Sequence, residues 1–149
     1  MIQNHQRRVR IHLPPLEEYF AQLRKILRLH GEVASIWFVD DAQMAQWNRD
    51  YRGKRGSTDV LSFPASANGD QRDFRAGSQR REDRGYLGDI AISAVVAKRN
   101  ARRFHRTLPQ ELRILILHGV LHLLGYDHER DNGEMERVEA GLRARLGLN

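Results

Sequence analysis

Three histidines near the C-terminal end constrain the fold of this chain more than any other feature. Within residues 118–128 they stand at positions 0, +4 and +10, with Gly125 at +7. Residues four apart share one face of a helix, so His118 and His122 should point the same way. Gly125 can take a left-handed conformation that ends the helix and turns the chain, which brings His128 round as a third imidazole. Three convergent imidazoles with an open position favour zinc or a similar divalent metal.

The residues around these histidines are apolar almost all round the helix, which indicates a buried helix. They are Leu112, Ile114, Leu115, Ile116, Leu117, Val120, Leu121, Leu123 and Leu124. A lone histidine in such a helix is more often a hydrogen-bonded core residue than a ligand. Two histidines one turn apart would each need a polar partner to offset desolvation, and a shared metal ion satisfies both. The spacing therefore favours metal binding.

The same spacing occurs in the long zinc-protease motif H-E-x-x-H-x-x-G-x-x-H, with one departure. Where a protease carries its general-base Glu, this chain has Gly119. The metal ligands are kept and the protease base is missing.

Composition narrows the class of protein. The chain has 149 residues and no cysteine. This length predicts one domain over residues 1–149, and the lack of cysteine excludes disulfides and thiolate ligands and fits a reducing compartment. Neither a membrane span nor a signal-peptide segment is predicted, so we expect a cytoplasmic protein that does not act in a membrane. The formal net charge of +6 suggests a polyanionic partner, with nucleic acid first and an anionic membrane surface second.

The apolar patterns predict the order of the elements. Strands are expected at 7–13 (ended by Pro14-Pro15), 33–39, 58–63 and 87–93. Helices are expected at about 16–30, at 40–49 with Asp40 as N-cap, at 94–104 with Ser93 as N-cap, from Pro109 through the histidines, and after Gly133 to about Leu146. Residues 51–56 form a basic glycine-rich loop, and the polar stretch from about 65 to 85 predicts a surface excursion.

Charged and aromatic residues add two further expectations. Lys98, Arg99, Arg102, Arg103 and Arg106 form a basic stripe at helical spacing, which suits RNA phosphates and equally suits a solvated helix face. Trp37, Trp47 and Phe104 are assigned to the core rather than to base stacking.

Several separated blocks make the chain similar to the YbeY family of bacterial metal-dependent endoribonucleases. The blocks are Asn48 with Tyr51-Arg52-Gly53, Thr58-Asp-Val-Leu-Ser-Phe-Pro64, Leu87-Gly-Asp-Ile90, the histidine motif, and Met135-Glu136 with Glu139. They extend over about residues 33–140. Two features depart from the family pattern: Ile114 stands where many members have a further histidine, and the excursion at 65–85 is longer.

The resemblance implies a single α+β domain, with a small mixed sheet of about four strands and the metal-binding helix packed centrally on it. It also implies one Zn²⁺ ion per chain held by His118, His122 and His128, and a functional arginine at Arg52. The implied role is cleavage of single-stranded RNA in ribosomal RNA processing, at the 3′ end of 16S rRNA, and in ribosome quality control. Ribosomal RNA, the ribosomal subunit and ribosomal proteins are the implied partners.

Side-chain chemistry gives these residues roles and leaves some open. A guanidinium such as that of Arg52 can grip two phosphate oxygens at once. The general base is either a metal-activated hydroxide or a carboxylate from elsewhere. Asp127 could orient an imidazole or could be a turn residue, and Glu111 is expected to pair with an arginine. Asp59 and Ser62 could lie at the rim of the cleft or make structural hydrogen bonds.

Three functions therefore compete. The first is a metal-dependent endoribonuclease acting on ribosomal RNA. The second is a zinc-protease-like enzyme, against which Gly119 argues. The third is an assembly factor that binds ribosomal RNA or the ribosome and holds a structural metal.

Overall fold

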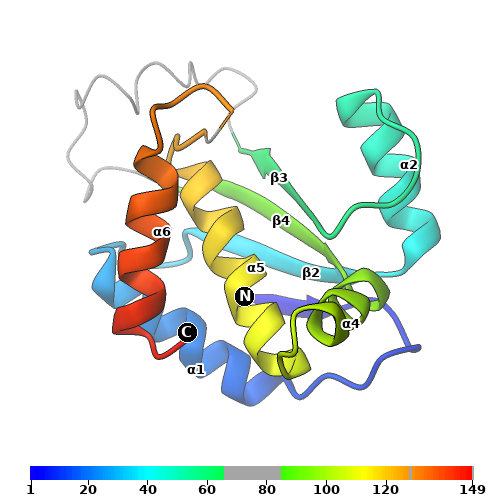
Figure 1. Cartoon of the computed structure of the whole chain (residues 1–149), viewed down its shortest axis with the longest axis horizontal. Coiled ribbons are helices and arrows are strands. Elements are labelled where there is room, and N and C mark those ends of the chain that lie inside the picture. The colour runs from blue at the N-terminus through cyan, green and yellow to red at the C-terminus, as the bar shows by residue number, and fades with distance from the viewer. Residues whose placement is uncertain (66–84, 128, 149) are drawn as a thin grey trace.

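A four-stranded mixed sheet forms the centre of the fold. The computed structural model describes residues 1–65, 85–127 and 129–148. Its strands are β1 (Ile2–Asn4), β2 (Ala34–Val39), β3 (Val60–Pro64) and β4 (Gly88–Ser93), in the order β1-β2-β4-β3. β2 pairs in parallel with β1 and β4, while β3 runs antiparallel to β4 (Figure 1).

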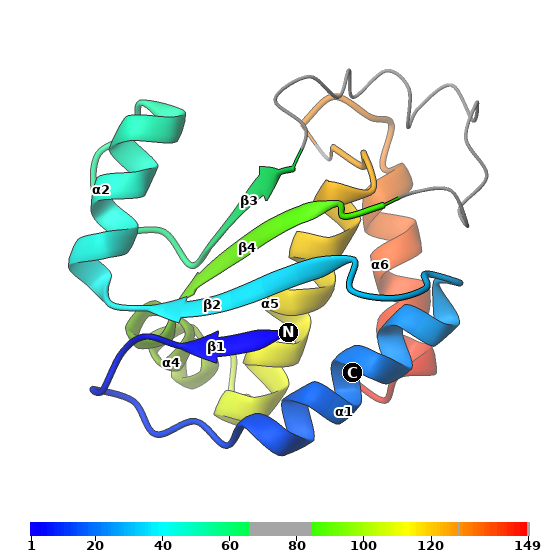
Figure 2. The same ribbon diagram turned by 180° about the vertical axis from the view of Figure 1, so that it is seen from behind.

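The helices cover the sheet unequally. In the described residues they are α1 (Leu13–Ile26), α2 (Asp41–Arg52), α4 (Ala94–Arg103), α5 (Leu108–Leu123) and α6 (Glu134–Arg145). Helix α5 crosses one face of the sheet, flanked by α4 on one side and by α1 and α6 on the other (Figures 1 and 2). This arrangement confirms the predicted α+β class with a central histidine helix.

The side chains along the central strands contribute alternately to two apolar clusters, because successive residues of a strand point to opposite faces of the sheet. Ile36 and Ile90 belong to the main core under α5. Val39, Leu61 and Ala91 point the other way and pack with Met44 of α2 in a smaller cluster. The sheet therefore separates the helix that carries the histidines from the helix that carries Arg52.

The predicted caps are present. Asp40 accepts a hydrogen bond from the Gln43 N–H at 2.8 Å, and the Ser93 hydroxyl accepts one from the Val96 N–H at 3.2 Å. Thr107 and Gln110, which were not predicted as a cap, form a capping box at the start of α5. Each cap satisfies a backbone N–H that the first turn leaves unpaired, which is why these helices begin where the sequence predicts.

The first strand was predicted at the wrong place. The alternation at 7–13 does not form a strand; β1 ends at Asn4, and α1 already begins at Leu13. The Gln6 side chain accepts from the Val9 N–H at 2.9 Å and donates to the Val9 carbonyl at 2.8 Å, so that backbone is paired without a sheet neighbour. The following Pro14-Pro15 pair lies in the first turn of α1, where a missing N–H costs nothing.

Three other predictions need correction or lie beyond the described residues. Helix α2 continues to Arg52 and ends at Gly53 with φ 66°, so the basic loop is shorter than predicted. Phe104 is 50% exposed and not a core residue, whereas Trp37 and Trp47 are partly buried against the smaller cluster. Most of the predicted polar excursion, residues 66–84, lies outside the described part of the chain.

Among the described helices, none is long and apolar enough to span a membrane.

Candidate active site

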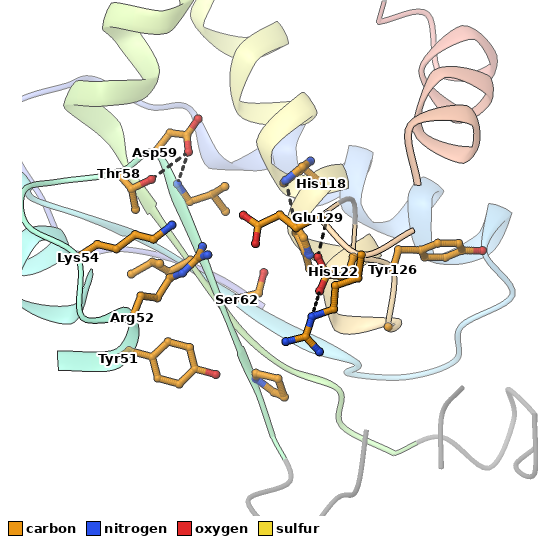
Figure 3. Close-up of a pocket in the computed structure, with 16 residues that line it drawn as sticks. Tyr51, Arg52, Lys54, Thr58, Asp59, Ser62, His118, His122, Tyr126 and Glu129 are labelled. Atoms are coloured by element: carbon orange, nitrogen blue, oxygen red, sulfur yellow. Dashed lines mark hydrogen bonds and ion pairs between the residues drawn. The ribbon is translucent and has the colours of Figure 1, made fainter. Parts of the chain in front are cut away.

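A cleft of about 560 Å³ lies where the C-terminal ends of α2 and α5 face each other across β3. Its lining residues are Tyr51, Arg52, Lys54, Thr58, Asp59, Val60, Leu61, Ser62, Pro64, His118, His122, Gly125, Tyr126, Asp127, Glu129 and Arg130. Figure 3 shows Arg52 and Lys54 on one wall, with His118 and His122 on the other. The two wall segments are brought together only by the fold, because they lie far apart in sequence.

The two described histidines converge as their spacing predicts. The Nε2 atoms of His118 and His122 are 3.0 Å apart, and the rings meet edge to face at an interplanar angle of 76°. Two nitrogens bound about 2.0–2.1 Å from a tetrahedral zinc ion lie about 3.3 Å apart. The separation of the two Nε2 atoms is therefore close to that of two zinc ligands, and this pair could hold such an ion.

Glu139 of α6 fixes the orientation of the first histidine. Its Oε1 lies 3.1 Å from His118 Nδ1. Burial raises the pKa of the Glu139 carboxyl, but the hydrogen bond and charge of His118, with a contribution from Arg143, outweigh that effect and hold the pKa below its usual range. A carboxylate accepting from Nδ1–H leaves the Nε2 lone pair of His118 directed at the cleft, which is the arrangement found behind many metal-bound histidines.

The third predicted ligand, His128, lies outside the described residues. Within residues 1–65, 85–127 and 129–148, no group of three or more His, Cys, Asp or Glu side chains is placed to hold a metal ion. Gly125, the predicted turning point, does have a left-handed φ of 100°, and it follows Leu124, the C-cap of α5. The chain thus turns where the sequence predicts.

At Gly119, α5 lies directly against the sheet. A Cβ at this position would lie 2.8 Å from Ile90 Cγ2, and the Gly119 carbonyl accepts a 3.2 Å hydrogen bond from the Ser62 hydroxyl. Ser62 and Ile90 are paired in the β3–β4 ladder. The missing glutamate is therefore explained by packing: position 119 faces the sheet and has no room for a side chain.

The facing wall is basic. Arg52 occupies the last turn of α2, and the exposed Tyr51 ring lies 4.7 Å from the ring of Phe63. The buried Asn48 amide donates to the Gly56 carbonyl at 2.9 Å and so ties the loop that bears Lys54 back to the helix. These contacts explain why an asparagine precedes the Tyr-Arg-Gly block.

Four polar residues considered from the sequence now have defined contacts. Asp59 and Ser62 line the cleft and also make structural bonds: Asp59 accepts from the Val60 N–H at 2.8 Å and from Asn100 Nδ2 at 3.1 Å. Asp127 is a turn residue, since its Oδ1 accepts from the Glu129 N–H at 3.0 Å. Glu111 pairs with an arginine as predicted, its Oε1 lying 3.2 Å from Arg106 Nη1.

The sequence marked Glu139 only as part of a family block and gave it no role in this site, and it did not single out Glu129, Lys54 or Tyr126. The apolar pattern of α6 does contain a feature that points to a buried role for Glu139. Met135 and Leu142 are the buried residues of α6, and position 139 falls four residues after the first and three before the second. An acid on the apolar stripe of a helix calls for a buried partner. The other cleft residues lie on turns whose course no periodic pattern specifies.

The fold and this cleft define an α+β protein with a histidine pair facing a basic wall. The sequence model of the family described as Endoribonuclease YbeY matches residues 1–147. The chain belongs to the YbeY family. This membership supports a role as an endoribonuclease, a nuclease of the hydrolase class.

Individual relatives agree with the family match. The chain is 42% identical to the endoribonuclease YbeY of Solibacter usitatus over 135 residues, covering 91% of this chain and 80% of that protein. It is 38% identical to that of Syntrophotalea carbinolica, over 97% of this chain and 93% of the relative. The solution structure of TM1509 from Thermotoga maritima shares the fold, with a TM-score of 0.60 at 24% identity, covering 98% of this chain and 89% of the other.

Proposed function

We propose that this chain is a metal-dependent endoribonuclease that cuts single-stranded RNA, with one zinc ion held by His118, His122 and His128. The observation that carries the proposal is the pair of Nε2 atoms 3.0 Å apart, at a cleft whose opposite wall carries Arg52 and Lys54. When bound, such an ion supplies a water of lowered pKa and a positive charge beside a phosphoryl oxygen.

The basic wall binds the scissile phosphate. Arg52 can donate two parallel N–H groups to two phosphate oxygens, and it stays charged at any working pH. Lys54 adds a second positive charge from the same side of the cleft. Negative charge increases on the phosphate oxygens as the bond breaks, so these cations stabilise the transition state more than the substrate.

Glu129 is the carboxylate best placed to accept a proton from the nucleophile. Of the carboxylates that line the cleft in the described part of the chain, Asp59 is bonded to Asn100 and Val60, and Asp127 to the Glu129 N–H and the Arg130 guanidinium. The Glu129 side chain is exposed and extends into the cleft (Figure 3). A solvent-accessible carboxylate can accept a proton from either a water or a ribose 2′-hydroxyl.

The proposed substrate is ribosomal RNA, and the proposed role is maturation of the 3′ end of 16S rRNA and ribosome quality control. The ribosomal subunit and its proteins would be the partners. Membership of the YbeY family and the net charge of +6 support a ribonucleoprotein setting.

Chelation provides the test of this function. The purified chain should cut a single-stranded RNA with the 3′-terminal sequence of precursor 16S rRNA, lose that activity in a chelator, and regain it on addition of zinc. A duplex of the same sequence should resist cutting, because its phosphates cannot adopt an in-line geometry within the cleft. Binding without cutting would favour the assembly-factor alternative, and cutting that ignores the chelator would exclude a metal-dependent mechanism.

Glu139→Gln should weaken zinc binding by about 10–100-fold, the usual cost of losing a hydrogen-bonding partner of a metal ligand. The amide keeps the shape and one acceptor but loses the charge that favours Nδ1–H on His118. The affinity is measured by competition with a chromogenic chelator. Glu136→Gln, an exposed acid on the same helix, is the matched control and should bind zinc as the wild type does. Equal affinities in the two variants would show that Glu139 does not position His118.

A further inference from the structure

The outer face of α4 has a composition that the active site does not explain. We propose that this surface, formed by Lys98, Arg99, Arg102, Arg103 and Phe104 and called the α4 basic face, binds the single-stranded RNA that continues out of the cleft. The inference rests on the proposed nuclease function, because it extends the path of the same substrate.

Packing leaves this face open. Ala94, Ala97 and Ala101 are buried, and their small side chains let α4 lie close to α5 and the sheet. The opposite side of the helix is exposed, and it carries the four cations of the α4 basic face. The helix is about 15 Å long at 1.5 Å per residue, which is enough to follow several nucleotides.

These cations are available to a phosphate backbone. Residues 94–110 contain no acid, and within the described part of the chain none of the four cations forms an ion pair. Arg106, which the sequence pattern places in the same stripe, differs because its guanidinium is engaged by the buried Glu111 at 3.2 Å. Exposed cations of one sign repel one another only weakly in water, but together they attract a polyanion whose bound counterions they can replace, so the charge pattern favours such a partner.

Phe104 indicates that the polyanion has exposed bases. Its ring is 50% exposed at the end of α4, with the guanidinium carbons of Arg103 and Arg106 at 5.6 and 5.1 Å from its centroid. His105 follows with a left-handed φ of 55°, which turns the chain sharply and leaves the ring at the surface. A single exposed aromatic is common, but one set among arginines resembles the stacking platforms on which unpaired bases lie. Duplex RNA and lipid headgroups offer no such base.

The helix that carries the α4 basic face is hydrogen-bonded to a residue of the cleft. Asn100 Nδ2 donates to Asp59 Oδ2 at 3.1 Å, and the Ser93 N–H donates to the Asp59 carbonyl at 2.9 Å. Asp59 and Thr58 line the cleft, so α4 begins next to a residue of its lining. Figure 1 shows α4 next to the ends of β2 and β4, close to the base of α2. An RNA strand leaving the cleft past Asp59 would therefore reach α4.

The test measures RNA binding apart from cleavage. The metal-free full-length chain, in chelator, is titrated with a fluorescent oligouridylate of about 20 nucleotides, longer than the ~4–16 nucleotides that one small domain covers. The first variant combines Lys98→Gln, Arg99→Gln and Arg102→Gln. The matched control combines Lys25→Gln, Arg28→Gln and Arg145→Gln, which removes the same charge from exposed positions on α1, its C-terminal turn and α6.

The α4 variant should bind about tenfold or more weakly near 0.1 M salt, and the slope of log affinity against log salt should fall by about 2, since each lost contact with a single strand contributes ~0.7. The control should lose about twofold or less, with an unchanged slope. Phe104→Leu keeps the charge and should weaken binding by about fivefold or more without changing the slope.

Three outcomes overturn the inference: equal losses in the α4 variant and the control, no RNA binding by the wild type, or a loss by the α4 variant of binding to anionic lipid vesicles but not to RNA. These results are separate from the proposed function. If the α4 variant cuts and binds RNA as the control does, the nuclease assignment stands, and the claim that the α4 basic face binds RNA is wrong. If the wild type never cuts RNA but the α4 variant alone loses RNA binding, the α4 basic face is confirmed as an RNA-binding surface and the nuclease assignment fails.

Discussion

His122→Ala should reduce RNA cleavage to below about one per cent of the wild-type rate, because a metal site that lowers the pKa of water from about 15.7 to near 7 is lost with its ligand. Zinc binding should weaken in parallel. The variant should still fold, since His122 is only half-buried and alanine is the strongest helix former. The measurements are cleavage of a labelled single-stranded RNA, zinc content by mass spectrometry, and the circular dichroism spectrum.

Two controls make this result specific. His30→Ala removes an exposed histidine outside the cleft and should change neither zinc content nor cleavage. Arg52→Ala should retain zinc yet lose about 10²–10³-fold in rate, the usual cost of removing one donor that stabilises transition-state charge. If His122→Ala cut as fast as the wild type, a contaminating nuclease or a metal-independent reaction would account for the activity, and the proposed site would be wrong.

Gly119→Glu, the substitution that would recreate the zinc-protease motif, should destabilise the fold by about 3 kcal/mol or more. The new Cβ would lie 2.8 Å from Ile90 Cγ2, and the carboxylate would be buried against the sheet. We expect a lower urea midpoint and no gain of peptidase activity.

Gly141→Glu is the matched control for Gly119→Glu, because it makes the same exchange within α6, where a Cβ would meet nothing within 4 Å. Glutamate is a better helix former than glycine, so this variant should gain up to about 0.5–1 kcal/mol. Combining Ile90→Ala with Gly119→Glu should cost less than the sum of the two single changes, because the room that alanine leaves relieves the contact at position 119. Equal stability of the two glutamate variants would mean that Gly119 does not seat α5 on the sheet.

The sequence predicted the features that depend on local patterns. The buried histidine helix, the caps at Asp40 and Ser93, and three of the four strands follow from periodicity and from side chains that satisfy nearby backbone groups. The first strand was misplaced because a Gln6 side chain pairs the backbone of Val9, which no periodic pattern reveals.

The active site was predicted less completely, since a cleft depends on residues brought together by tertiary packing. The spacing of the histidines fixed their convergence, because both stand on one helix. Glu139 reaches His118 only because α6 packs beside α5. Lys54 faces the two histidines only because the fold places the end of α2 opposite the end of α5. Phe104 was assigned to the core from its type alone, and the left-handed turn at His105 leaves it at the surface.

The two apolar clusters lie on opposite faces of the sheet, and each of them supports one wall of the cleft. Histidine-bearing α5 is anchored in the main core, whereas α2, with Arg52, rests on the smaller cluster around Met44 and Leu61. Repacking that smaller cluster would widen or narrow the gap that an RNA strand must enter while leaving the imidazole pair undisturbed. Substrate accommodation and metal chemistry can thus diverge separately in evolution, through substitutions that never touch the cleft itself.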